Sequence, residues 1–264
     1  MKKFSNILLS IQKNGIARII LNESKTYNAL SFDTLKSLLK IFKSFNKDKK
    51  IKVIVIEGSG RGFSAGHNLK ELKALKGKPQ YKKIFSLCSD LMMEITFNNK
   101  PVIAKVHGAA FAAFAAGCQL VASCDLALSD KEAIFSTPGV NIGLFCSTPM
   151  VALSRKVNRK ISMKMLLTGE HISAEYAKEI GLINDYFDST NLEEEVTKLA
   201  NTIASKSSLV LKFGKQAFYN QLEMPMKAAY KYTSKIMTEN MMTFDAKEGI
   251  SSFLEKRSPN WKNK

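Results

Sequence analysis

The 264-residue sequence has no apolar run long enough to cross a membrane, since a spanning helix needs about 20 consecutive apolar residues. The short apolar run near the start, Ile7–Ile11, is followed at once by Gln12 and Lys13, so it is too short for an export signal. The first residues also lack the arginine-rich pattern of a typical transit peptide. We therefore expect a soluble protein of the cytoplasm, without a membrane partner.

Cysteine and histidine are scarce, with four and three residues, and no two cysteines have the spacing of a metal-binding CxxC pair. We expect no metal site and no resident cofactor, and we expect the thiols to be buried and reduced. The four cysteines are Cys88, Cys118, Cys124 and Cys146.

Acidic residues are the minority charge, because 40 Lys and Arg stand against 23 Asp and Glu and give a formal net charge of +17. Two kinds of partner could use such a charge: a polyanion such as RNA, or a phosphorylated ligand such as coenzyme A. The lysines are scattered along the chain rather than clustered, which favours general solvation of the surface over a nucleic-acid interface.

Short β segments alternate with helical segments in the first half of the chain. Ile7–Ile11 and Ala17–Leu21 flank Asn14-Gly15, which predicts a β-hairpin. Ser31 is suited to cap a helix that runs to about Phe45, where apolar residues recur at helical spacing. The pattern of strand, helix and strand then repeats, which predicts an α/β fold with parallel strands. The further segments are strands at Lys52–Glu57, Pro101–Val106, Asp125–Leu128 and Ile134-Phe135, a helix near Lys82–Phe97, and a helix that starts within Gly108–Gly117.

The chain beyond about Arg155 reads as entirely helical. No linker rich in Pro or Gly precedes it, so we expect it to pack on the core. We divide the chain into an α/β core, residues 1–195, and a helical C-terminal region, residues 196–264. The expected helices are Arg159–Thr168, Ser173–Ile180, Leu192–Lys206, Ser207–Asn220, Thr233–Phe244 and Lys247–Lys256.

Three stretches together resemble the crotonase (enoyl-CoA hydratase/isomerase) superfamily. Asn28-Ala29-Leu30 is similar to its NALS turn, Gly62–Leu72 to its GxxFxAGxDLxE segment, and Lys100–Asp125 to its KPxIAxVxGxAxGGGxxLxxxCD segment. The resemblance implies the crotonase (ClpP-like) fold, a spiral of ββα repeats with a helical C-terminal trimerisation region, and a coenzyme A thioester as substrate or ligand. It continues at Leu167-Thr168-Gly169, Ala177–Leu182 and Phe253–Arg257, and a likeness to one subgroup shows at Phe63–His67, Ala115–Leu120 and Thr137–Pro149.

The resemblance also implies an oxyanion hole made of two main-chain amides. A thioester carbonyl gathers negative charge when the acyl group reacts, so two converging N–H donors in a dry site lower the barrier. The matching positions are His67, after Gly66, and Ala116. Either side chain is tolerated because the donors belong to the backbone. The His67 imidazole either lines the pocket or transfers a proton, as its ordinary pKa would suit work near neutrality.

The two glutamates with which family hydratases activate water are missing. Their positions hold Gln119 and Gly139, of which an amide cannot accept the proton of water and glycine offers no group at all. Hydratase activity is therefore expected to be weak or absent. Cys146 could act as a nucleophile only if its pKa were lowered, and no sequence feature indicates this.

A duplication of Ala-Ala-Phe precedes Ala116, where Ala112-Ala113-Phe114 follows Ala109-Ala110-Phe111. Three added residues inside a helix would rotate everything beyond them by about 300°. The loop must therefore absorb the insertion if the Ala116 amide is to point at a thioester.

Further contacts and the assembly follow from the resemblance alone. Coenzyme A should lie against Ala65, Gly66 and His67, with lysines near its phosphates. A homotrimer or hexamer is implied, in which C-terminal residues reach a neighbour's ligand site. The implied contact residues beyond these three are Lys25, Leu69, Lys70, Phe253 and Lys256.

Three functions stay open at this point. The chain could be an acyl-CoA enzyme, with a hydratase or isomerase as the named class, whose reaction uses other groups. It could be a protein that binds acyl-CoA without chemistry, which the missing carboxylates favour. RNA binding is the third, although no basic helix interleaved with aromatic residues is present.

Overall fold

The structure, a computed structural model, describes residues 2–4, 6–108 and 113–264 and is built around a seven-stranded sheet. The strand order is β1-β2-β3-β4-β5-β7-β10, with antiparallel pairs from β1 to β3 and parallel pairs from β3 onward. This confirms the predicted α/β class with parallel pairing. The strands are β1 (Lys2–Phe4), β2 (Ile7–Ile11), β3 (Ile16–Leu21), β4 (Val53–Gly58), β5 (Val102–Val106), β7 (Leu126–Asp130) and β10 (Asp185–Phe187).

The predicted hairpin is present between β2 and β3, where Ile11 pairs with Ala17. Gly15 adopts φ +89°, and a Cβ there would lie 2.8 Å from the Lys50 carbonyl oxygen, so the turn needs glycine. The carbonyl of Gly15 also accepts a hydrogen bond from the Lys52 N–H (2.8 Å), which leads the chain into β4.

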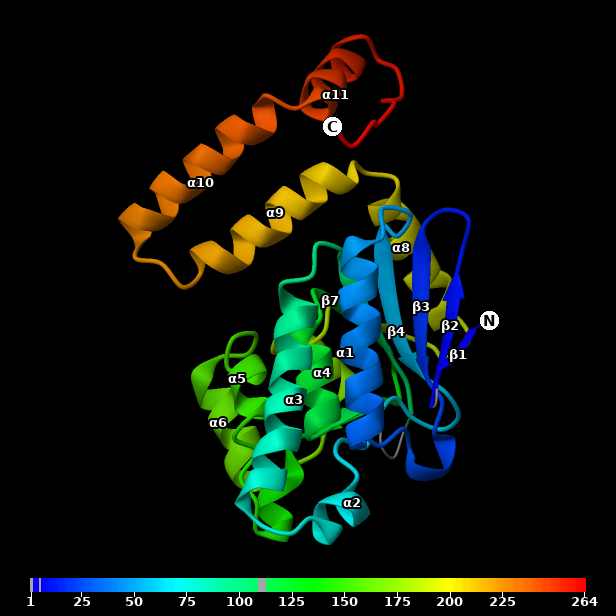
Figure 1. Ribbon diagram of the computed structural model, residues 1–264, viewed down its shortest axis with the longest axis vertical. Helices are drawn as coiled ribbons and strands as arrows, with labels where there is room; N and C mark the ends of the chain where they lie inside the picture. The colour runs from blue at the N-terminus through cyan, green and yellow to red at the C-terminus, as the bar shows by residue number, and fades with distance from the viewer. Residues whose placement is uncertain (1, 5, 109–112) are drawn as a thin grey trace.

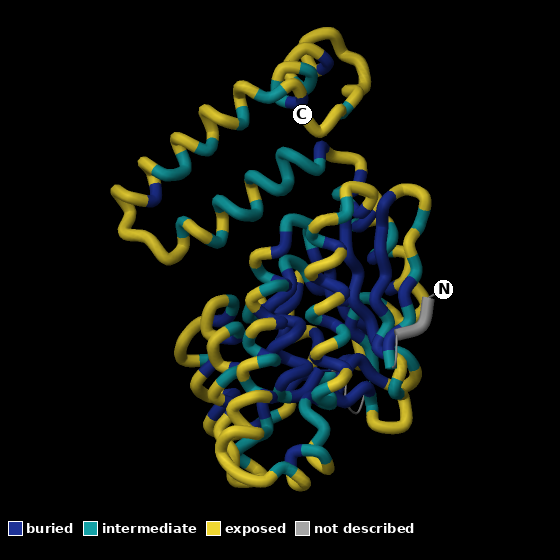
Figure 2. Tube along the Cα trace, viewed as in Figure 1, coloured by how far each residue is buried: buried dark blue, intermediate teal, exposed yellow. Residues whose placement is uncertain are grey.

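Helices cover both faces of the sheet because side chains alternate along each central strand. In β4, Ile54 and Ile56 belong to one apolar core, with helices α1 (Phe32–Lys47) and α3 (Lys78–Thr96). Val53 and Val55 belong to a second core beneath helix α8 (Leu192–Ala204). Figure 2 shows these central strands as the most buried part of the molecule.

Ionic contacts fasten α8 to the sheet. Glu193, in its first turn, pairs with Arg18 of β3 and Lys105 of β5. The buried Glu57 carboxylate of β4 accepts from the same two cations, at 3.1 and 2.9 Å.

The predicted division after residue 195 falls inside α8, and this division stays a prediction.

A smaller sheet, of order β6-β8-β9, lies beside the large one. It joins Ala113–Phe114, just after the undescribed residues 109–112, to the segment that carries Gly139. Its elements and the helices around it are β6 (Ala113–Phe114), α4 (Ala116–Ser123), β8 (Ile134–Ser136), η2 (Pro138–Ile142), α5 (Pro149–Leu153), α6 (Arg159–Thr168), β9 (Ile172–Ser173) and α7 (Ala174–Glu179).

The last three helices extend away from the sheet (Figure 1). They are α9 (Ser208–Gln221), α10 (Met226–Met241) and α11 (Phe244–Leu254). Helix α9 is fixed to the core by Lys215 and Tyr219, which both bond the Asp125 carboxylate, at 2.7 and 3.0 Å. Within the described residues, no helix is both long and apolar enough to span a bilayer.

Two details of the predicted helices were wrong. The region beyond Arg155 is not wholly helical, because β9 and β10 lie within it; strands of two and three residues are too short to show a period of two. Helix α10 begins at Met226 rather than Thr233, since Pro225 provides its N-cap and its exposed apolar residues weaken the helical pattern. The helix expected within Gly108–Gly117 begins only at Ala116, and residues 109–112 lie outside the described part.

Candidate functional site

The segment that follows β4 approaches the start of α4 very closely. The Phe114 N–H donates to the Ser64 carbonyl (3.0 Å), which aligns the two segments. Gly66 has φ +84°, and a Cβ on it would lie 2.7 Å from the Phe114 carbonyl oxygen and 3.1 Å from the Ala116 nitrogen. Only a glycine fits this approach without displacement, and it brings residue 67 beside the Ala116 amide.

The Ala116 amide lies at the first helical position of α4. The turn before it uses Ala115 at φ 46° and ψ −110°, a strained conformation for a residue with a side chain, and the Ala115 N–H donates to the Ser136 carbonyl (2.9 Å). Helix α4 thus starts after the Ala-Ala-Phe duplication, so the added residues do not rotate it. The duplication lies partly in residues 109–112, outside the described part.

Neither the His67 N–H nor the Ala116 N–H donates a hydrogen bond to any described residue. His67 instead lies in a short parallel bridge with Leu30, whose N–H donates to the Gly66 carbonyl (2.7 Å). The predicted oxyanion hole requires two main-chain N–H groups that lie near one another and have no acceptor within the protein. Their role toward a ligand stays a prediction.

The His67 imidazole packs edge-on against Phe85 of α3, with ring centroids 5.5 Å apart. Both ring nitrogens are buried, and neither has a hydrogen-bond partner within the described chain. Burial lowers the pKa of His67 below its ordinary value, and the nearby Leu30 carbonyl opposes this only in part. The imidazole is therefore neutral at neutral pH.

Gln119 is buried one helical turn beyond Ala116. Its side-chain oxygen lies 3.8 Å from the Cys88 sulfur of α3, which is positioned to donate to it. Burial raises the pKa of Cys88 to about 12, so this contact is made by a neutral thiol. The amide of Gln119 cannot take a proton from water.

Gly139 lies in η2 beside Cys146. A Cβ at Gly139 would lie 2.5 Å from the Leu144 carbonyl oxygen and 2.9 Å from the Cys146 sulfur. The structure thus leaves no room for a side chain at this position. Burial raises the pKa of Cys146, only partly offset by its hydrogen bond with the Gly139 backbone, and this weighs against a nucleophilic thiolate.

The residues expected to contact coenzyme A fall into two groups. Lys25, Leu69 and Lys70 have exposed side chains. The Ala65 N–H already donates to the Tyr27 carbonyl (2.8 Å), so it is not available to a ligand. Of the remaining two, Phe253 lies in the last turn of α11 and Lys256 follows the end of that helix. Helix α11 lies at the opposite end of the molecule from α2 (Leu69–Ala74), which begins close after His67 (Figure 1).

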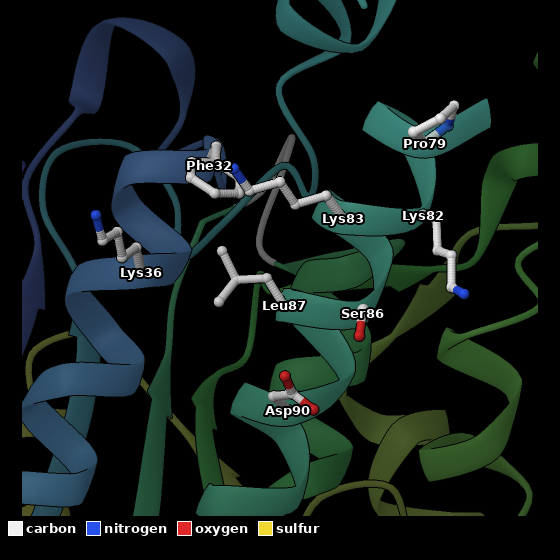
Figure 3. A pocket seen from close by; sticks show the side chains of 8 residues that line it. All are labelled: Phe32, Lys36, Pro79, Lys82, Lys83, Ser86, Leu87 and Asp90. Atoms are coloured by element: carbon white, nitrogen blue, oxygen red, sulfur yellow. The ribbon is translucent and has the colours of Figure 1, made fainter. Parts of the chain in front are cut away.

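A groove that sequence reasoning missed runs between α1 and α3, with a volume of about 560 Å³ (Figure 3). It includes neither His67 nor Ala116. Its lining residues come from two helices that are separate in the sequence, so no local sequence signal could have shown the groove. The lining residues are Phe32, Lys36, Pro79, Lys82, Lys83, Ser86, Leu87 and Asp90.

Comparison with known proteins adds a strong family signal. The family described as Enoyl-CoA hydratase/isomerase matches residues 11–264. The chain is 45% identical to the rat protein named Enoyl-CoA hydratase domain-containing protein 3, mitochondrial, over 95% of this chain and 82% of the relative. Among solved structures, an enoyl-CoA hydratase of Mycobacterium smegmatis has a TM-score of 0.95 and 42% identity, over 98% of this chain and 99% of the other. Human enoyl-CoA hydratase domain-containing protein 3 has a TM-score of 0.91 and 44% identity, over 97% and 100%.

These comparisons bear on four of the expectations. The crotonase resemblance, the likeness to one subgroup and the fold are confirmed. The cytoplasmic location is contradicted, because relatives from rat, frog and human, at 45–46% identity, are all named mitochondrial. That expectation was wrong because it rested on the composition of the first residues, which does not determine the compartment of a protein.

Proposed function

Because the chain belongs to the enoyl-CoA hydratase/isomerase family, we propose that it binds an acyl-coenzyme A thioester and holds the thioester oxygen with the main-chain amides of His67 and Ala116. The supporting observation is the close approach at Gly66. A Cβ atom added to Gly66 would lie 3.1 Å from the Ala116 nitrogen. Two preorganised donors stabilise developing negative charge, and loss of one such donor typically costs about 3–4 kcal/mol.

The hydration reaction itself is not part of this proposal. Gln119 is an amide, Gly139 has no side chain, and the pKa shifts of His67 and Cys88 have no carboxylate among their causes. The site therefore lacks the two carboxylates with which the family hydratases activate water. An acyl-CoA enzyme with another reaction and a non-catalytic acyl-CoA-binding protein both fit this site.

A panel of acyl-CoA thioesters tests the proposal, with binding measured by calorimetry and products by mass spectrometry. We expect at least one thioester to bind more tightly than free coenzyme A, since the thioester oxygen adds two hydrogen bonds. A new product would identify an enzyme, and tight binding without any product would identify a binding protein. Absence of binding across the panel would refute the proposal.

The place of the ligand can be tested by charge reversal. We propose that Lys25 and Lys70 meet the phosphates, so Lys70→Glu should weaken coenzyme A binding by roughly tenfold, as expected for about 1.4 kcal/mol. Lys36→Glu is the matched control, because Lys36 lies in the separate groove of Figure 3. A larger effect of Lys36→Glu than of Lys70→Glu would indicate that the ligand binds in that groove instead.

We further propose that the chain assembles as a homotrimer or hexamer. Phe253 is 83% exposed, and α10 and α11 carry further exposed apolar side chains such as Met226 (77%) and Tyr230 (73%). Burying such surface stabilises an assembly by about 25 cal/mol per Å². Since Phe253 lies far from its own His67, it can serve only the site of a neighbour. A monomeric mass in sedimentation equilibrium would refute this.

A further inference from the structure

The groove between α1 and α3 has an apolar floor. Phe32, the first residue of α1, and Leu87 of α3 lie between the two helices, and both are half-buried (Figure 3). Lys83 reaches across from α3, and its Nζ lies 5.0 Å from the centroid of the Phe32 ring, so its aliphatic stem adds to the floor. With a volume of about 560 Å³, the groove can receive side chains of a partner.

Lysines stand along both edges of this floor. Lys36 and Lys40 lie one turn apart on α1, and Lys78 and Lys82 lie one turn apart on α3. All four are exposed, and none forms an ion pair with an acidic side chain of the described residues. Figure 3 shows Lys36 on the side of α1 away from α3, and Lys82 on the side of α3 away from α1. The floor is therefore a strip of apolar surface between two rows of positive charge.

The positive charge is greatest at the end of the groove where α3 begins. Asp90 is the one acidic side chain among the lining residues, and it lies further along α3 than Lys82 (Figure 3). Asp33, in the first turn of α1, does not line the groove. The first turn of α3 holds no acidic residue, and its N-cap, Gly77, makes no side-chain hydrogen bond. The helix dipole therefore adds to the charge of the lysines at this end.

A third helix matches this surface better than a flat or polyanionic partner does. A lipid bilayer is flat and does not reach the floor of a groove between two helices. A nucleic acid offers phosphates to the lysines but no apolar side chains to Phe32 and Leu87. An amphipathic helix presents an apolar stripe with polar residues on both sides, which is the complement of this groove. The lysines require that these polar residues be acidic, as in the charged positions beside the apolar seam of packed helices.

We propose that the groove between α1 and α3 binds an acidic amphipathic helix of another protein. Its apolar side chains lie on Phe32 and Leu87, and its carboxylates pair with lysines such as Lys36 and Lys82. The groove includes neither His67 nor Ala116, so this inference does not depend on the proposed acyl-CoA site. The starts of α1 and α3 also lie far from α10 and α11 (Figure 1), so a docked helix leaves those helices free.

The test measures binding of a labelled synthetic peptide to the full chain by fluorescence anisotropy. The peptide has about 18 residues, which is about five helical turns, with leucine at the first and fourth positions of each heptad and glutamate beside them. A scrambled peptide of the same composition is the matched probe, because its general attraction to a chain of net charge +17 is the same. We expect the patterned peptide to bind at least about tenfold more tightly than the scrambled one.

Charge reversal locates the edges of the site. Lys36→Glu combined with Lys82→Glu should weaken binding of the patterned peptide by about tenfold. Lys47→Glu combined with Lys50→Glu is the matched control, because both lysines are exposed at the far end of α1 and the change in net charge is the same. The control should bind within about threefold of the wild type, since distant charges are screened by salt.

Two further variants test the floor and the single carboxylate. Leu87→Gln should weaken binding by about tenfold, because it removes apolar contact area, and circular dichroism checks that the fold is kept. Asp90→Asn should tighten binding by about threefold, because it removes the one lining group that repels glutamate.

Equal affinity for the patterned and scrambled peptides, or equal effects of the two lysine pairs, would overturn the proposal. Tighter binding of a single-stranded RNA oligomer than of the patterned peptide would assign the lysines to nucleic acid instead. A smaller mass of the Lys36→Glu and Lys82→Glu variant in sedimentation would show that a second copy of the chain covers the groove, which also overturns it.

Discussion

The close approach at Gly66 makes a quantitative prediction for Gly66→Ala. An added methyl group would lie 2.7 Å from the Phe114 carbonyl oxygen, and alanine would have to hold φ +84°. The left-handed backbone costs about 1–2 kcal/mol, and an overpacked contact against main-chain atoms costs about 1–3 kcal/mol. We expect the free energy of unfolding to fall by about 2–5 kcal/mol.

Gly143→Ala separates these two costs. Gly143 has φ +76°, and a Cβ there would meet no described atom within 4 Å. This variant therefore carries the backbone cost alone, about 1–2 kcal/mol. The difference between the two variants isolates the contact between the Gly66 segment and the start of α4.

Urea denaturation followed by circular dichroism measures both values, and calorimetry with the best-bound acyl-CoA of the panel measures the effect on the site. Gly66→Ala should also weaken thioester binding, because the methyl group forces the His67 amide away from the Ala116 amide. Gly143→Ala should bind as the wild type does. Equal destabilisation of the two variants would show that the segments are not in contact, and the paired-amide argument would fail with it.

The remaining predictions concern the missing carboxylates, the anchor of α9 and one thiol. The rate of crotonyl-CoA hydration, measured as loss of enoyl thioester absorbance, should be at least about a thousandfold below that of a competent hydratase. Gln119→Glu should not restore it, because Gly139 supplies no second carboxylate. A normal rate in either protein would contradict this. Lys215→Met leaves the Asp125 carboxylate without its buried cation, so the free energy of unfolding should fall by about 3–5 kcal/mol in urea titrations. A loss below about 1 kcal/mol would show that Tyr219 and the backbone suffice. Since burial raises the pKa of Cys88 to about 12, iodoacetamide at pH 8 should alkylate it only after unfolding; equal rates in native and unfolded protein would disprove this.

Local sequence signals predicted the elements that position the site. Asn14-Gly15 predicts its hairpin because the turn depends on two residues alone, and Ser31 predicts the start of α1, where its hydroxyl accepts from the Thr34 N–H (3.2 Å). The short strand β10 could not be found in this way. Its three residues are set by pairing with β7, a contact between segments far apart in the chain.

The candidate site shows the same division between local and non-local information. The motif around Gly66 identified the His67 amide and the Lys100–Asp125 motif identified the Ala116 amide, but the close approach of the two segments at the Phe114 carbonyl is not revealed by any local pattern. The unpartnered nitrogens of His67 are likewise a tertiary property, since they depend on Phe85 from another helix. Sequence could name the groups, and only the fold could indicate which of them lack partners.

The segment around Gly139 explains why the absence of a carboxylate is built into this chain. A glutamate there would have to displace the Leu144 carbonyl and the Cys146 sulfur, both of which lie within 3 Å of the position its Cβ would take. Displacing the Leu144 carbonyl would also disturb the N–H of the same residue. That N–H donates to the Gly139 oxygen (2.9 Å), and this hydrogen bond closes the η2 turn. A single substitution therefore cannot return the second glutamate without rebuilding the turn. Any second carboxylate at this site would therefore have to come from a position other than 139.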